Sequence, residues 1–224
     1  MNAVVFDLDG VILDTEELWN EVREGLARER GGRWSDRAQA EMMGMSSTEW
    51  SQYMHDVVGL PESPEEINRE VVDRMLDRYT QALPLIDGAV DAVKRLAAEW
   101  PLGLASSSNR VLIDRVLEVS GLASSFQATV SSEEVARGKP APDVYLEVAC
   151  RLDVDPAEAA AVEDSASGIR SAHAAGMHVI AIPNHAFPPP DDVLAVAAVV
   201  LDSIGELTPE TVREAERLST ASSG

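Results

Sequence analysis

Basic residues and cysteine are both scarce in this sequence of 224 residues. Only 18 Lys and Arg residues stand against 39 Asp and Glu residues, which gives a formal net charge of −21. A surface of that sign repels phosphate backbones and anionic lipids, so we expect no nucleic-acid partner and no membrane-surface partner. The single cysteine, Cys150, cannot form an internal disulfide, which is typical of a reducing compartment. We expect Cys150 to be buried and inert in a helix.

Long apolar runs are also missing from the sequence. No run approaches the ~20 residues that cross a bilayer, and no basic region precedes the apolar run at residues 3–6, so we expect no signal peptide. An apolar share of 45% and a charged share of 25% are typical of a soluble globular enzyme. We therefore expect a cytoplasmic protein, with one domain or a core domain that carries an insertion.

Apolar runs and helical periodicities alternate along most of the chain. Strands are predicted at residues 3–8, 102–105, 127–130, 159–162, 178–182 and 197–201. Helices are predicted at residues 15–30, 38–43, 48–58, 64–83, 89–99, 111–119, 142–152, 165–175 and 209–218. This alternation predicts an α/β fold with a doubly wound parallel sheet. Residues 1–15 and 84–224 would form the core, and residues 16–83, which show only helical patterns, would be an inserted all-helical domain.

Acidic pairs follow two of the predicted strands. Asp7 and Asp9 lie two residues apart where the first strand ends, and Gly10 allows a sharp turn there. Two such carboxylates repel each other unless a cation lies between them, and Mg²⁺ is a hard ion held by carboxylates. Glu163 and Asp164 follow a later strand and would also be suitable metal ligands. The alternatives are solvated aspartates in a turn for the first pair and helix N-caps for the second.

Hydroxyls and a lysine follow two further strands. The run that contains Ser106, Ser107 and Asn109 enters a helix start, where free N–H groups and hydroxyls form an anion site, unless the residues simply cap the helix. Lys139 lies in a loop framed by two prolines and could offset charge during phosphoryl transfer, or it could be an ordinary solvated lysine. Ligands of doubly wound sheets bind at the carboxyl ends of the strands, so all four features are expected at one edge.

In order and spacing, these features resemble the motifs of the haloacid dehalogenase superfamily of phosphohydrolases. The matching residues are Asp7-x-Asp9-Gly10-Val11, Ser106, Lys139 with Pro140, and Glu163-Asp164. The resemblance covers essentially the whole chain and implies a Rossmann-like core. Residues 16–83 are similar to the helical cap of the β-phosphoglucomutase-like branch, with hinges near Thr15 and at residues 83–84.

The resemblance also implies catalytic roles. Asp7 would attack phosphorus and become an aspartyl-phosphate. Asp9 would protonate the departing alkoxide and then take a proton from the attacking water. Lys139 would neutralise charge between Asp7 and the transferring group.

Binding roles follow from the same resemblance. Ser106 and backbone amides near Leu8 and Ser107 would hold the phosphoryl oxygens, and Asn109 and Trp19 are further candidates for contact with the substrate. Mg²⁺ would be held by Asp7, by the main-chain carbonyl of Asp9 and by Asp164, with Glu163 acting through water.

Within the superfamily, the residues favour a phosphatase that acts on a small sugar or polyol phosphate. Retention of Asp9 argues for phosphate chemistry, because displacement of a halide needs only the first aspartate. Mutases of this branch carry a His and an Arg in the cap, and Trp19 and Ser47 stand at those positions here. Arg110 could still bind a distal anion, so a β-phosphoglucomutase-type mutase is the alternative; a protein-binding scaffold is a non-enzymatic one.

Several methionines and histidines remain. Met42, Met43 and Met45 are expected either to line an apolar part of the pocket or to pack in the helical core. Trp19 either packs between cap and core or faces the substrate. The four histidines have no ligand-like spacing and are expected to be structural or exposed: His55, His173, His178 and His185.

Overall fold

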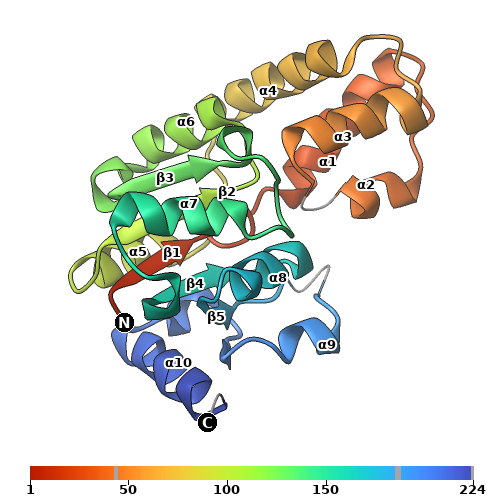
Figure 1. The fold of residues 1–224 in the computed structure, drawn as a ribbon. Coiled ribbons are helices and arrows are strands. Elements are labelled where there is room, and N and C mark those ends of the chain that lie inside the picture. The colour runs from red at the N-terminus through yellow and green to blue at the C-terminus, as the bar shows by residue number, and fades with distance from the viewer. Residues whose placement is uncertain (43–44, 185–187, 223–224) are drawn as a thin grey trace.

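A parallel sheet of six strands lies at the centre of the computed structural model, which describes residues 1–42, 45–184 and 188–222. The strand order is β3-β2-β1-β4-β5-β6 (Figure 1). The strands are β1 (Ala3–Phe6), β2 (Leu102–Ser106), β3 (Ala128–Ser131), β4 (Ala159–Glu163), β5 (His178–Ala181) and β6 (Val199–Val200). The order reverses between β1 and β4, and ligands of such sheets bind beside that reversal. The predicted doubly wound α/β fold is confirmed.

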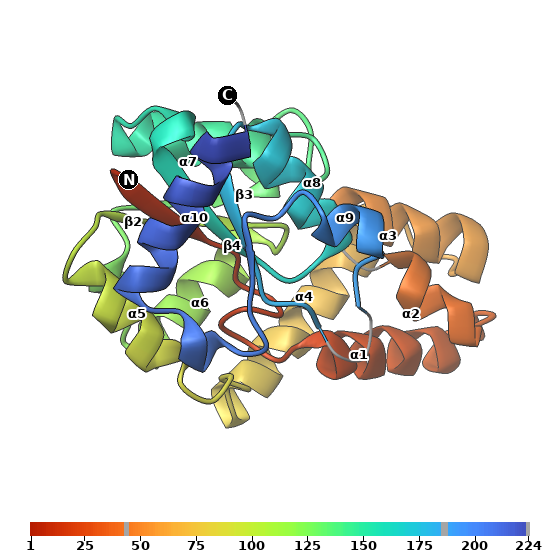
Figure 2. The same ribbon diagram turned by 90° about the horizontal axis from the view of Figure 1, so that it is seen from below.

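Helices cover both faces of the sheet. Val4 and Phe6 belong to one apolar cluster, and Ala3 and Val5 belong to the other, because successive side chains of a strand point to opposite faces. The first face packs against α5 (Ala89–Ala97), α6 (Arg110–Ser120) and α10 (Pro209–Ser222). The second packs against α7 (Asp143–Leu152) and α8 (Ala166–Ala174). In Figure 2 the sheet lies between α7 and α8 on one side and α5 and α6 on the other.

The segment between β1 and α5 is helical. It contains α1 (Glu16–Glu29), α2 (Asp36–Met42), α3 (Ser47–Tyr53), a π-helical turn (Met54–Val58) and α4 (Pro64–Gln81). Its described residues contain no strand, as the periodicity predicted. Ser46 and Ser63 begin α3 and α4 with reciprocal capping boxes to Glu49 and Glu66.

Several predicted boundaries differ from the structure. A single helix was expected over residues 48–58, but the α-helix ends at Tyr53 and continues as the π-helical turn, which Gly59 closes with a φ of 83°. β1 ends at Phe6, before residues 7 and 8, because the chain turns there. The strand predicted at residues 197–201 is only Val199–Val200, and the short α9 (Asp191–Leu194) was not expected.

Two further expectations concern the burial of Cys150 and the presence of a membrane-spanning helix. Cys150 is exposed on α7, so the prediction that it is buried is wrong. It occupies the solvent side of α7, whereas Val144, Tyr145 and Val148 face the sheet. Among the described residues, no helix is both long enough and apolar enough to span a membrane.

Candidate active site

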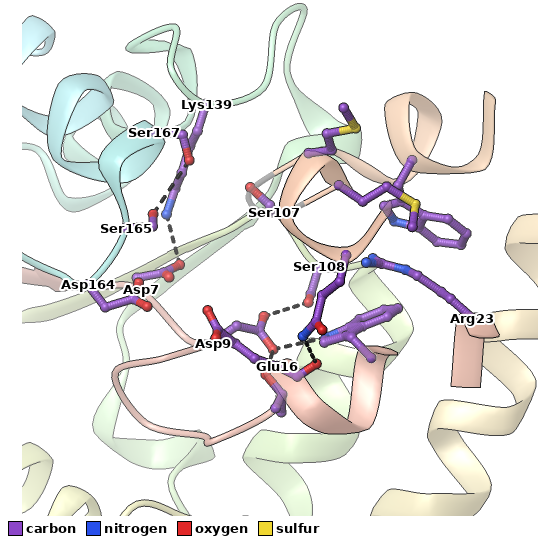
Figure 3. A pocket seen from close by; sticks show the side chains of 16 residues that line it. Asp7, Asp9, Glu16, Arg23, Ser107, Ser108, Lys139, Asp164, Ser165 and Ser167 are labelled. Atoms are coloured by element: carbon purple, nitrogen blue, oxygen red, sulfur yellow. Dashed lines mark hydrogen bonds and ion pairs between the residues drawn. The ribbon is translucent and has the colours of Figure 1, made fainter. Parts of the chain in front are cut away.

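A pocket lies between the carboxyl edge of the sheet and the helical segment (Figure 3). The core lines it with side chains that follow different strands, among them Asp7, Ser107, Lys139 and Asp164. The helical segment lines it with others, among them Trp19, Arg23, Gln39, Met42, Met45 and Trp50. Parallel strands bring their carboxyl ends to one edge, which explains why residues so far apart in sequence meet here.

Lys139 bridges two buried carboxylates. Its Nζ donates to Asp7 Oδ1 at 2.8 Å and to Glu163 Oε1 at 2.5 Å. The Lys139 side chain is 3% exposed, and the side chains of Asp7 and Glu163 are 8% and 0% exposed. Burial opposes the charge, but the two carboxylates raise the pKa of Lys139 above its ordinary value. The ammonium is therefore fixed as a cation against Asp7, and Lys139 is not a solvated loop residue.

Glu163 is fully occupied by protein donors. Its Oε1 also accepts from the Tyr145 hydroxyl at 2.7 Å, and its Oε2 accepts from the backbone N–H groups of Asp164 and Ser165. Gly168 leaves room for this carboxylate, because a Cβ on that glycine would lie 1.8 Å from Glu163 Oε1. These contacts fit a residue that positions Lys139. Glu163 was also expected to support a metal ion through water, and none of its contacts with the described residues bears on that role.

Three carboxylates converge at the sheet reversal. Asp7, Glu163 and Asp164 each offer an oxygen within 4.8 Å of the others, and all three residues are buried. Burial raises the pKa of Asp7 to about 7, although Lys139 opposes the shift. Burial, then the charges of Glu163 and Asp7, raise the pKa of Asp164 well above its ordinary value. Lys139 balances part of this negative charge, and a further bound cation would balance the rest.

The donor set fits a hard divalent cation. The Asp164 carboxylate accepts no hydrogen bond from any described residue, and Gly10 gives it space, since a Cβ there would lie 1.9 Å from Asp164 Oδ2. Carboxylate oxygens without protein donors are the ligands that Mg²⁺ prefers. The residues that could hold such an ion are thus Asp7 and Asp164, with the main-chain oxygen of Asp9 as the further ligand expected from the sequence.

The Asp9 side chain lies apart from that cluster and is held by three donors. Thr15 Oγ1 donates to Oδ1 at 2.6 Å, Ser108 Oγ donates to Oδ2 at 2.6 Å, and Trp19 Nε1 lies 3.4 Å from Oδ1. Figure 3 shows the carboxylate directed toward the pocket on the side of the helical segment. Both oxygens of the Asp9 carboxylate are thereby fixed in orientation, and Asp9 lines the same cavity as Asp7.

The serines at the end of β2 and directly after it have different roles. Ser106 is fully buried and its Oγ accepts from the Ser108 N–H at 3.0 Å, so it shapes the turn and does not line the pocket. Ser107 does line the pocket, and its buried Oγ has no partner among the described residues. Asn109 donates to Asn68 on α4 and to Glu133, so it joins the helical segment to the core. Ser106 and Asn109 were expected to contact the substrate, but they do not line the pocket. Ser107 does line it.

Trp19, Met42 and Met45 all line the pocket. Met42 is also buried in the apolar cluster, so it serves both as core and as wall. Met43 lies outside the described residues. His55 and His178 bond main-chain oxygens away from the pocket, and His173 lies on α8; His185 is outside the described part of the chain.

Some pocket residues were missed from the sequence. Arg23 is 8% exposed, and its guanidinium carbon lies 4.6 Å from the ring centre of Trp19 and 4.7 Å from that of Trp50. Burial lowers the pKa of Arg23 to about 9. The spacing of Trp19 and Arg23, four residues apart on one helix, was a signal that both share a face. Tyr145, which bonds Glu163 but does not line the pocket, gave no comparable signal, because Glu163 is distant in sequence.

Glu16, where α1 begins, is another missed residue. It lines the pocket, and burial, then the charges of Asp14 and Asp9, raise its pKa to about 7. An acid in the first turn of a helix is unremarkable in a sequence, which is why nothing marked it out.

A family model described as haloacid dehalogenase-like hydrolase matches residues 4–182. Over 92% of its length the chain is 31% identical to hexitol phosphatase B of Escherichia coli (strain K12), of which it covers 94%. It is also 31% identical to β-phosphoglucomutase of Bacillus subtilis (strain 168), over 81% of this chain and 83% of that protein. With 30% identity over 86% of its length, it spans only 52% of the bifunctional riboflavin kinase/FMN phosphatase of Arabidopsis thaliana.

A crystal structure of β-phosphoglucomutase from Clostridium difficile has the same fold. The TM-score is 0.85 with 22% identity, and the match covers 99% of both chains.

Proposed function

Because the chain belongs to the haloacid dehalogenase-like hydrolases, we propose that it is a Mg²⁺-dependent phosphatase that hydrolyses a small phosphate monoester through a phosphorylated Asp7. One observation carries this proposal: Asp7 lies in a pocket with Lys139 at 2.8 Å on one side and the carboxylate of Asp164 on the other. Phosphoryl transfer needs positioning and charge neutralisation more than any other help, and this arrangement supplies both.

The metal would be held by Asp7, Asp164 and the main-chain oxygen of Asp9. When bound, Mg²⁺ supplies positive charge that binds phosphoryl oxygens and stabilises the charge of the transition state. Glu163, whose oxygens are all engaged, holds Lys139 in place.

In the first step, an Asp7 oxygen attacks phosphorus while the ester P–O bond breaks. Lys139 offsets the negative charge of Asp7 and the incoming group, and the unpartnered Ser107 hydroxyl donates to a phosphoryl oxygen. Asp9, in its protonated form, gives its proton to the departing alkoxide. Thr15 and Ser108 hold the Asp9 carboxyl in the orientation that this transfer requires.

In the second step, water attacks the phosphorus of the acyl phosphate. Asp9, now ionised, takes the proton from that water, the bond between Asp7 and phosphorus breaks, and inorganic phosphate leaves. Residues 16–83 act as a cap that closes over the substrate, hinged near Thr15 and residues 83–84, and exclude bulk water during both steps.

The substrate would be a sugar or polyol phosphate. The relationship to hexitol phosphatase B supports this class, and the pocket wall on the cap side combines aromatic and polar side chains. The net charge of −21 supports a small-molecule partner over nucleic acid or a membrane surface, and the single cysteine supports a cytoplasmic location.

The mutase is the second candidate, since β-phosphoglucomutase of Bacillus subtilis is also 31% identical, over 81% of this chain. Two positions favour hydrolysis instead. Where mutases of this branch carry a cap His and a cap Arg, this chain has Trp19, whose Nε1 lies by Asp9, and Ser47, whose Oγ is 3.4 Å from Glu133, so neither of these two positions carries a cationic side chain. Conversion of β-glucose 1-phosphate into glucose 6-phosphate that depends on a bisphosphate primer would establish the mutase.

The test is phosphate release from p-nitrophenyl phosphate and from a panel of sugar phosphates. Wild-type protein should be active with Mg²⁺, inactive after EDTA, and active again when Mg²⁺ is restored. Asp7→Asn should be inactive, while Asp91→Asn, a matched change at an exposed site on α5, should keep full activity. Asp9→Asn should lose about 10²- to 10⁴-fold in turnover and accumulate a phosphoenzyme that hydroxylamine cleaves. Full activity of Asp7→Asn would rule out Asp7 as the nucleophile.

A further inference from the structure

Arg23 is a buried cation on the cap side of the pocket. It projects from α1 into the cavity (Figure 3), where its guanidinium lies over the rings of Trp19 and Trp50. The two indoles are themselves in contact, with ring centres 6.0 Å apart. Two indole rings, one from α1 and one from α3, therefore hold this guanidinium in one place.

No described residue pairs with this charge. Arg23 has no ion pair or hydrogen bond within the described part of the chain, and its buried Nε has no acceptor. The charge of Asp9 acts on Arg23, but both Asp9 oxygens are already occupied by Thr15, Trp19 and Ser108. Leaving a buried guanidinium without an acceptor is destabilising, and ring contacts offset this only partly.

The position of Arg23 separates it from the phosphoryl group. That group must reach Asp7 and Lys139 at the sheet edge, whereas Arg23 belongs to the opposite, cap-side wall. The part of an ester that lies toward the cap is its leaving group. A planar guanidinium with free N–H groups is suited to bidentate recognition of a carboxylate or a phosphate.

We infer that Arg23, held by Trp19 and Trp50, binds a second anionic group, a carboxylate or a phosphate, on the leaving group of the substrate. This inference rests on the proposed phosphatase function and narrows its substrate class to phosphate esters that carry a further anion. Sugar hydroxyls would satisfy some N–H groups but would leave the buried charge unbalanced.

The experiment compares ester pairs that differ in this one group. 6-Phosphogluconate and glucitol 6-phosphate differ at the far end by a carboxylate against a hydroxymethyl group, and glucose 1,6-bisphosphate and glucose 6-phosphate differ by a second phosphate. For wild-type protein, kcat/KM should favour the doubly anionic member of at least one pair by about 10- to 100-fold. The pair that shows the preference identifies the anion as carboxylate or phosphate.

Arg23→Met should remove that preference, mainly by loss of kcat/KM for the doubly anionic ester. Arg23→Lys, which keeps the charge but not the fork, should retain part of it. Arg28→Met is the matched control on the same helix, where Arg28 is exposed, and should leave the ratio unchanged. Thermal unfolding of each variant checks that the cap remains folded.

Two outcomes would overturn the inference. One is a wild-type preference ratio near one in both pairs; the other is a preference that survives Arg23→Met, which would leave Arg23 as a packing residue only. Failure of the proposed function is a different result, because wild-type protein would then release no phosphate from p-nitrophenyl phosphate with Mg²⁺ present.

Discussion

Lys139 is one of only two lysines in a chain whose other cationic side chains are arginines. A compact ammonium can lie between Asp7 Oδ1 and Glu163 Oε1, whereas the wider, planar guanidinium of arginine would not fit the same two contacts. The charge is stable there because two carboxylates and the Tyr145 hydroxyl complete the network. Its stabilising role and the catalytic role proposed for it can therefore be separated by mutation.

Lys139→Met should both destabilise and inactivate the protein. Removing the cation of a buried ionic network leaves the charges of Asp7 and Glu163 without a counter-ion, with a loss of about 3 kcal/mol in the free energy of unfolding. Turnover should fall by about 10²- to 10³-fold because charge is no longer offset in the transition state. Urea unfolding and phosphate release measure the two effects.

The double variant Lys139→Met with Glu163→Gln is the informative control. It removes one of the two unpaired anions, so part of the lost stability should return while the activity stays low. Recovery of activity in the double variant would show that Lys139 acts only by holding the fold together.

Glu16 allows a prediction about pH. Burial, with Asp14 and Asp9, raises its pKa to about 7 in the folded protein, against about 4.3 in an unfolded chain. Between these values the folded state binds more protons than the unfolded state, so this group lowers the free energy of unfolding as pH rises from about 4 to about 7. Glu16→Gln should remove that loss. At about pH 8 the variant should be more stable than wild type by about 1 kcal/mol, a value reduced for partial exposure.

Thermal unfolding without added metal, at about pH 4.5 and about pH 8, measures this effect. Glu17→Gln, a change at the exposed neighbouring position, should shift the unfolding temperature equally at both pH values. Stabilisation of Glu16→Gln that is the same at both would contradict the assigned ionisation.

At the scale of elements, the sequence predicted those features that local residue patterns determine. Apolar runs predicted the strands, and polar residues directly after β1, β2 and β4 predicted which edge holds the site, because parallel topology brings strand ends together. It did not predict which hydroxyl faces the pocket. Ser106 and Ser107 are adjacent and chemically alike, and only the turn that places the Ser108 N–H on Ser106 Oγ distinguishes them.

Contacts between elements could not be predicted from the sequence either. Tyr145 on α7 meets Glu163 after β4, and Arg23 on α1 meets Trp50 on α3, through packing that no spacing within one element encodes. The end of α3 is similar: the change from α-helix to a π-helical turn at Met54 follows from how that turn packs, with Met54 and Val58 buried.

Gly168 in α8 gives a prediction at this scale. In most helices, Gly→Ala stabilises by about 0.5–1 kcal/mol. At Gly168 the new Cβ would meet the Glu163 carboxylate at 1.8 Å, so either α8 or Glu163 must move and Lys139 loses its position. Gly168→Ala should therefore lower both stability and turnover. Gly25→Ala in α1, where nothing lies within 4 Å of the added Cβ, is the matched control and should stabilise. Parallel gains in both variants would show that Glu163 can relocate at no cost.

At the scale of the whole molecule, an anionic substrate must approach a protein of net charge −21. The cations proposed to bind it, Lys139 and Arg23, are buried in the pocket and contribute little to the field at long range. The long-range field should therefore slow capture at low ionic strength, when the Debye length is about 30 Å.

Added salt should therefore increase kcat/KM at concentrations that leave kcat unchanged. Raising KCl from about 10 mM to about 150 mM shortens the Debye length to about 8 Å, and we expect kcat/KM to rise by about two- to five-fold. Steady-state kinetics at saturating Mg²⁺ measure this. Glucose 1,6-bisphosphate should show a steeper rise than glucose 6-phosphate, because repulsion scales with the charge of the ligand. A fall in kcat/KM with salt would mean that the local charge of the pocket, and not the net charge of the protein, governs the encounter.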